Sequence, residues 1–134
     1  MAELGLVYPN QTLSARRVAE RLGISVKYLE QIMSALKASG LVRAVRGVNG
    51  GYALARAPGE ITLFDVFSVL EGAPVFVDCL RASEECPRES VCAARDVWRE
   101  MNTALTDILR RTTVADLVER GRRKRATQAK MYHI

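Results

Sequence analysis

Residues 14–40 read SARRVAERLGISVKYLEQIMSALKASG, and two short amphipathic helices can be placed in them. Ser14 and Ser25 each stand directly before apolar residues at helical spacing, where a serine side chain caps the first turn. Gly23 and Gly40 end the two segments, because glycine is the common residue just beyond a helix. Two helices joined by a three-residue turn that contains glycine are typical of a helix-turn-helix.

The apolar residues of these helices predict which faces are buried. The first helix runs to residue 22 and the second to about residue 39, so that residues three and four apart share a face. The expected core positions are Ala15, Val18, Ala19 and Leu22 in the first helix, and Leu29, Ile32, Met33 and Leu36 in the second.

Residues 41–56 read LVRAVRGVNGGYALAR, and they predict a β-hairpin. Apolar residues alternate with basic or small ones on both sides of an Asn-Gly-Gly turn, which is the pattern of two strands joined tightly. A helix-turn-helix followed by a hairpin is the order of a winged helix. The expected fold is therefore mainly α, with a small β-hairpin wing.

Other elements are expected on both sides of this unit. Residues 1–8 are apolar enough to be the end of a helix whose beginning is missing. Thr62 can cap a short helix over residues 63–70, and a loop with two prolines then carries three cysteines to residue 92.

Residues 93–111 contain no glycine or proline, and apolar residues recur among them at helical spacing. A helix of this length spans about 30 Å, more than so small a domain can cover, and we expect it to pack against a second copy. Thr113 and Asp116 form a capping box for one more turn to residue 120. The expected parts are a winged helix-turn-helix domain at 1–72, a cysteine loop at 73–92, a dimerisation helix and final turn at 93–120, and a basic mobile tail at 121–134.

Composition places limits on the class of protein. With 134 residues and 49% hydrophobic, the chain can form one compact core with an extension. No run approaches the roughly 20 apolar residues that cross a bilayer, so we expect a cytoplasmic protein without a membrane partner. The net charge is +5: residues 12–56 and 120–134 are each net +6, whereas residues 57–119 are net −6. Such basic blocks attract polyanions.

The second helix of a helix-turn-helix enters the DNA major groove by its N-terminal residues. Its solvent face offers Lys27, Tyr28, Glu30, Gln31 and Ser34. Gln can pair with adenine, Glu can accept from cytosine, and Lys or Tyr can reach phosphate or guanine. The structural alternatives are that Tyr28 is a packed aromatic and that Glu30 only pairs with Lys27 or Lys37.

The hairpin adds a second set of candidate DNA contacts. At its tip, Arg46 and Asn49 are expected beside the minor groove, whose potential attracts arginine. The glycines of the turn would let the backbone approach the DNA closely. Arg16, Arg17 and Arg43 are expected on the flanking phosphates.

These residues resemble a known family. Residues 24–31, Gly40-Leu41-Val42, and Val45-Arg46-Gly47 with Gly50-Gly51-Tyr52 look like the IscR/NsrR group of bacterial winged-helix regulators, over about residues 13–117. The resemblance implies that Glu30, Gln31 and Arg46 contact a double-stranded DNA operator. It also implies a long dimerisation helix, in agreement with residues 93–111.

Cys79, Cys86 and Cys92 place three soft ligands within 14 residues. Thiolates bind iron–sulfur clusters or zinc, and either centre needs a fourth ligand. The resemblance implies an iron–sulfur cluster, of the 2Fe–2S or the 4Fe–4S type, whose state changes DNA affinity in response to iron, redox conditions or nitric oxide.

The fourth ligand stays open. Some relatives place histidine where this chain has Arg95, which cannot ligate. Weak candidates are Glu3 of a partner subunit, Asp78, Glu89 and Asp96, while the single histidine, His133, lies in the basic tail. The alternative is three reduced thiols in an empty loop, the state that oxidation of an exposed cluster also leaves behind.

The sequence thus predicts a DNA-binding transcriptional regulator controlled by an iron–sulfur cluster. A zinc- or thiol-switch regulator of the same fold and a cluster-free winged-helix protein-interaction module are the alternatives. An enzyme is not expected, because no Ser/His/Asp, Cys/His or paired-carboxylate set is evident.

Overall fold

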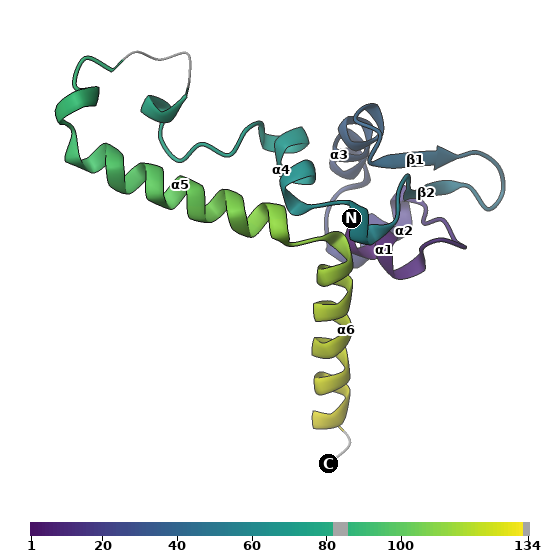
Figure 1. The fold of residues 1–134 in the computed structure, drawn as a ribbon. Coiled ribbons are helices and arrows are strands. Elements are labelled where there is room, and N and C mark those ends of the chain that lie inside the picture. Colours follow the sequence, from purple (N-terminus) through teal and green to yellow (C-terminus); the bar gives the residue numbers. More distant parts are fainter. Residues whose placement is uncertain (82–85, 133–134) are drawn as a thin grey trace.

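The computed structural model describes residues 1–81 and 86–132. A winged helix-turn-helix unit occupies the N-terminal half, and two long helices extend from it in different directions (Figure 1). The elements are α1 (Ala2–Val7), α2 (Ala15–Leu22), α3 (Val26–Ala38), β1 (Val42–Val45), β2 (Gly51–Leu54), α4 (Leu63–Glu71), α5 (Ala93–Arg111) and α6 (Val114–Met131). The predicted fold class, mainly α with a two-stranded wing, is confirmed.

Both predicted serine caps are present. The Ser14 hydroxyl accepts from the backbone N–H of Arg17 at 3.2 Å, and that of Ser25 accepts from Tyr28 at 3.1 Å. Val18 and Ala19 of α2 and Leu29, Met33 and Leu36 of α3 are buried in one core with residues of α1, β1, β2 and α6.

The prediction for Leu22 is wrong. Its side chain is 53% exposed, because α2 ends there and Ile24, in the turn that follows, packs against the core in its place. Ile32 is partly buried against the same core, as a residue on the edge of the apolar face should be.

The wing is an antiparallel pair in which Val42 faces Leu54 and Val45 faces Gly51. Its second strand is also tied to the segment before α2. The N–H of Tyr52 donates to the Leu13 carbonyl at 2.8 Å, and the Leu13 N–H donates to the Tyr52 carbonyl at 3.0 Å. The wing and the start of α2 therefore move as one piece.

α5 joins the winged-helix unit only near its C-terminal end and projects away from it (Figure 1). There the N–H of Leu63 donates to the Thr112 carbonyl at 2.8 Å, and the N–H of Val114 donates to the Ile61 carbonyl at 2.9 Å. The guanidinium of Arg110 lies 4.5 Å over the Phe64 ring, a cation–π contact between α5 and α4. These contacts fix the direction of α5 relative to α4.

The prediction that the last helical turn ends at residue 120 and is followed by a mobile tail is wrong. The capping box of Thr113 and Asp116 is present, but the helix that it starts continues to Met131. Gly121 does not interrupt the helix, because a single glycine costs a helix only about 1 kcal/mol relative to alanine. The Arg, Lys, Ala and Gln residues around it favour helix. His133 lies outside the described residues.

Among the residues that the structure describes, no helix is both long and apolar enough to cross a bilayer.

Candidate nucleic-acid interface and cysteine loop

The five predicted contact residues of α3 are exposed. Ser25 caps the helix at the end from which Lys27, Tyr28, Glu30, Gln31 and Ser34 project. Tyr28 is 55% exposed, so it is not a packed aromatic. Within the described ranges Glu30 makes no ion pair with Lys27 or Lys37, which leaves its carboxylate available to a ligand.

The predicted contacts outside α3 are also exposed: Arg16, Arg17, Arg43, Arg46 and Asn49. Arg17 and Asn49, 32 positions apart in the sequence, line one surface hollow together with Thr12 and Ser14. The Thr12 hydroxyl donates to the Asn49 carbonyl at 2.6 Å and holds the wing tip beside α2. Arg16 pairs with Glu20 one turn along α2, in an exposed ion pair that is easily exchanged.

Gly51 is needed for a close contact within the protein, besides the DNA approach that was expected of the wing glycines. A Cβ at this position would lie 2.4 Å from the Leu13 carbonyl oxygen, and its φ is +150°. The wing can pair with the segment before α2 only if this residue lacks a side chain. Thr12 and Gly51 are thus positioning residues that sequence reasoning missed.

The described parts of the cysteine loop, residues 73–81 and 86–92, lie beside the N-terminal half of α5. Its three cysteines are free and half-buried: Cys79 is in a short 3₁₀ turn (Asp78–Leu80), and Cys92 is the residue before α5. Phe76 stacks on Trp98 with centroids 6.3 Å apart, and its N–H donates to Asn102 at 3.1 Å. These contacts hold the first part of the loop on α5.

Arg95 ties the two sides of this loop together. Its side chain is only 11% exposed, pairs with Glu89, and donates to the Cys79 carbonyl at 3.3 Å. The hydrogen bond to Glu89 raises the pKa of Arg95, against a lowering by burial, and the charges of Glu89, Cys79 and Cys86 raise it further. The position that cannot ligate a metal therefore places a cation close to two of the thiols.

The donor chemistry of this loop fits an iron–sulfur cluster, because its three thiols are neither oxidised to disulfides nor buried in the core. Within residues 1–81 and 86–132, however, no three His, Cys, Asp or Glu side chains lie together as a metal site. The loop would have to close around a cluster in order to hold it.

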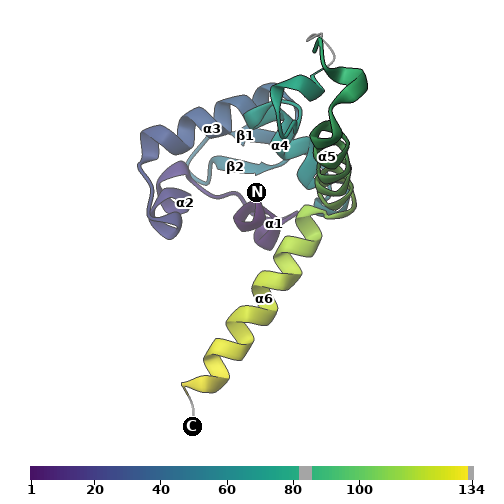
Figure 2. The same ribbon diagram turned by 90° about the vertical axis from the view of Figure 1, so that its left-hand side faces the viewer.

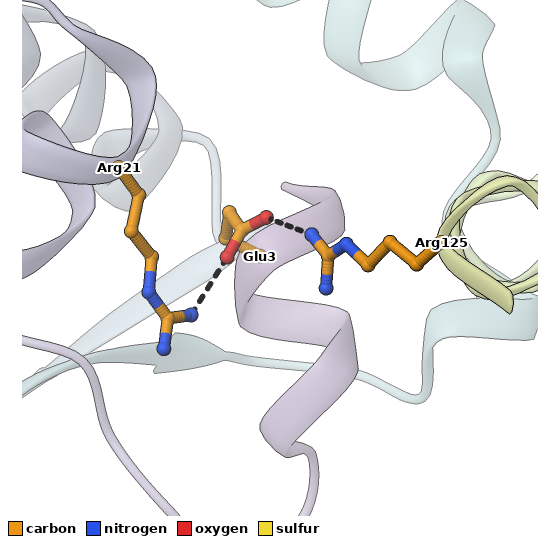
Figure 3. A network of polar contacts seen from close by, with 3 residues as sticks. All are labelled: Glu3, Arg21 and Arg125. Carbon is orange, nitrogen blue, oxygen red and sulfur yellow. Dashed lines mark hydrogen bonds and ion pairs between the residues drawn. The ribbon is translucent and has the colours of Figure 1, made fainter. Parts of the chain in front are cut away.

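Glu3 is engaged elsewhere. Its carboxylate accepts from Arg21 at 2.7 Å and from Arg125 at 2.9 Å, and its side chain is 15% exposed (Figure 3). Burial alone would raise the pKa of Glu3, but the hydrogen bonds and charges of the two arginines outweigh it and lower the pKa. A carboxylate held in this way is a poor candidate for a metal ligand.

α5 has no buried residue in this single chain. Its apolar positions are left open: Val97 is 52% exposed, Met101 39% and Ile108 47%. A contiguous apolar strip on a long helix indicates a surface that another chain covers.

Comparison with known proteins gives a consistent picture. A family model named Rrf2, described as an iron-dependent transcriptional regulator, matches residues 1–120. Protein Rrf2 of Nitratidesulfovibrio vulgaris is 38% identical over 108 residues, which cover 81% of this chain and 72% of that protein. The HTH-type transcriptional regulator CymR of Bacillus subtilis is 35% identical over 117 residues, which cover 87% of this chain and 80% of that protein. The regulator IscR of Pectobacterium carotovorum is 37% identical over 101 residues, covering 75% of this chain and 61% of that longer protein.

Solved structures agree with these matches. The structure of CymR, the global cysteine regulator of B. subtilis, superposes with a TM-score of 0.75 at 34% identity, covering 88% of this chain and 86% of that one. The structure of T. potens IscR superposes with a TM-score of 0.73 at 32% identity, covering 90% of this chain and 78% of that one. The predicted resemblance is confirmed, and the relatives are transcriptional regulators rather than enzymes.

Proposed function

The chain belongs to the Rrf2 family of winged-helix transcriptional regulators, and from this premise we propose that it binds a specific DNA operator as a homodimer under the control of its cysteine loop. The observation that carries the proposal is the joint exposure of the α3 and wing residues on a unit held together by the Leu13–Tyr52 bonds. A rigid unit presents groove-reading and phosphate-binding side chains at fixed spacing.

The contacts divide by chemistry. Gln31 and Glu30 would read base edges in the major groove, since an amide can pair with adenine and a carboxylate can accept from cytosine. Lys27, Tyr28 and Ser34 would contact phosphates or neighbouring bases. Arg46 and Asn49 would lie at the minor groove, and Arg16, Arg17 and Arg43 on the phosphates that flank it.

Dimerisation through residues 93–111 is the second part of the proposal. The open apolar strip of α5, with Val97, Met101 and Ile108, suits a second copy of the same helix. A two-fold dimer presents two copies of α3, and such proteins bind half-sites about one helical turn apart.

The third part is the sensor. We assign Cys79, Cys86 and Cys92 as the protein ligands of an iron–sulfur cluster, which when bound supplies a centre sensitive to iron supply, oxygen or nitric oxide. The iron dependence in the description of the matching family supports this choice. The side chains of Phe76 and Trp98 would keep the loop on α5 while the thiols converge.

A thiol switch is the second candidate, and one observation favours it. The loop holds three free, half-buried thiols, and Arg95 anchors the backbone of Cys79 by donating to its carbonyl at 3.3 Å. Oxidation of two such thiols to a disulfide would release two electrons and two protons to an oxidant such as a peroxide. This reaction would change the loop without any metal.

Duplex binding tests the regulatory part. Operators selected from random duplexes by the wild-type chain should bind at least about a thousandfold more tightly than random DNA at physiological salt. Affinity should fall steeply as salt increases. Equal affinity for all duplexes would instead support a protein-interaction module.

Metal analysis tests the sensor. Anaerobic reconstitution with iron and sulfide should give a coloured protein, and each of C79S, C86S and C92S should lose the colour while keeping the fold. A colourless wild-type protein that forms a disulfide with peroxide would favour the thiol switch. Zinc at one equivalent without iron would favour the zinc site.

A further inference from the structure

The second half of α6 is not needed for the core. The buried residues of this helix are Val114 and Val118, near its start. From residue 122 to residue 132 every side chain is exposed. Figures 1 and 2 both show this part of the helix standing clear of the rest of the molecule.

This exposed segment is strongly basic. Residues 120–134 include six Lys or Arg and no Asp or Glu. Arg123 pairs with Glu119, and Arg125 pairs with Glu3. The other cations of the helix, Arg120, Arg122, Lys124 and Lys130, make no ion pair within the described part of the chain, and of these Arg120 lies near enough to Asp116 for their charges to interact. Positive charge that the protein itself does not balance attracts an anionic partner.

α6 is held in a defined position by Glu3. The carboxylate lies between Arg125 of α6 and Arg21, in the last turn of α2 (Figure 3). Gly5 lets the helix come close, because a Cβ there would lie 2.7 Å from a methyl group of Val118. The basic segment therefore has a fixed orientation relative to the helix-turn-helix, and in Figure 2 it slants toward the side on which α2 lies.

We propose that the basic segment of α6, defined by Arg120, Arg122, Lys124 and Lys130, binds the phosphate backbone of the duplex outside the half-site that α3 reads. This inference rests on the proposed function. Exposed Lys and Arg side chains on a helix can bind DNA phosphates, because these contacts depend on charge and not on the base sequence. When α3 and the wing hold the operator, the flanking duplex is already at high local concentration. Weak additional contacts between its phosphates and α6 can then form.

Duplex length provides the test. The operator selected by the wild-type chain is prepared in a short form limited to its half-sites and in a form lengthened by about one helical turn on each side. The wild-type chain should bind the longer form more tightly. R120Q/K124Q should lose a large part of this gain. The slope of log affinity against log salt on the longer duplex should be lower by about 4, since the two subunits together lose four phosphate contacts of about 0.9 each.

K37Q/R56Q is the matched control. It removes the same charge from exposed positions outside α6 and should keep the full gain on lengthening. Circular dichroism and thermal unfolding establish that all three proteins are equally folded.

Two results would overturn the proposal while leaving the operator reading intact: no gain for the wild-type chain on lengthening, or an undiminished gain for R120Q/K124Q. If R120Q/K124Q weakens only dimerisation, the basic segment contacts the partner subunit instead of DNA. A wild-type chain that prefers no duplex sequence would overturn the proposed function itself.

Discussion

Gln31 and Arg17 are both exposed and lie near the same surface, but they would meet different parts of a duplex. An amide can form two hydrogen bonds to one adenine, whereas a guanidinium on a phosphate is indifferent to sequence. Their substitution should therefore separate specificity from affinity.

Gln31→Ala should reduce the free energy of binding to the operator by about 1–3 kcal/mol and relax selectivity at one base position of each half-site. Arg17→Gln should weaken operator and random duplexes alike and reduce the salt slope by about 1 per subunit, or about 2 for the dimer. Fluorescence anisotropy with single-base operator variants measures both. A uniform loss for Gln31→Ala would show that it does not read a base.

Gly51 is the residue on which the geometry of the wing depends most. Gly51→Ala places a Cβ against the Leu13 carbonyl at an unfavourable φ and should cost about 1–3 kcal/mol of unfolding free energy. Operator affinity should fall with it, because the wing shifts away from α2. Gly59→Ala is the control, since its Cβ would meet no atom within 4 Å. Equal urea midpoints for the two variants would contradict this account.

Prediction from sequence worked best where the interaction is local. Ser14, Ser25, Thr62 and Thr113 cap helices within three residues of themselves, so each could be read directly. Leu22 failed because burial at the end of a helix depends on what packs beside it.

At the scale of elements, the contact between α1 and α6 decides where the C-terminal helix points. Glu3 and Arg125 are 122 residues apart in the sequence, and no spacing pattern can pair them. The length of α6 is not evident from sequence for a different reason. Its low apolar content predicts a solvated tail, whereas helix propensity and the anchor at Val114 and Val118 favour a helix.

The Glu3 anchor should depend on pH. Its folded pKa is lowered, so its contribution to stability is present above the unfolded value of about 4.3 and is lost as pH falls through the folded pKa. Glu3→Gln should reduce the unfolding free energy by about 1–2 kcal/mol near pH 7. Chemical unfolding from pH 7 down to about pH 3 should show the two proteins converge; a constant difference would contradict the ion-pair account.

At the scale of the whole molecule, Cys92 lies far from the proposed DNA-reading surface of its own chain. α5 has 19 residues and spans about 28 Å, with Cys92 at one end and the contacts to α4 at the other. A change in the loop would reach DNA most directly through the placement of the two subunits. The cysteine spacing predicts a sensor, but the arrangement of its thiols around a cluster would depend on a partner and a cofactor, which the spacing does not specify.

Dimerisation should fail when charge enters the apolar strip. Val97→Asp should give a monomer by sedimentation velocity, with an unchanged circular dichroism spectrum because Val97 is 52% exposed in the single chain. Operator affinity should fall by about a hundredfold or more, since each half-site is then bound alone. Thr103→Asp, exposed on the opposite face of α5, makes the same charge change and should remain dimeric. If Val97→Asp and Thr103→Asp both remain dimeric, this interface is excluded.

The most direct test of control by the cysteine loop is one titration made in two states. The wild-type protein is reconstituted anaerobically with iron and sulfide, and its affinity for the selected operator is measured before and after the centre is removed by oxidation. We predict at least about a tenfold change for the operator, little change for random duplex, and no change for the triple variant C79S/C86S/C92S. Equal operator affinity of the wild-type protein in both states would contradict the account.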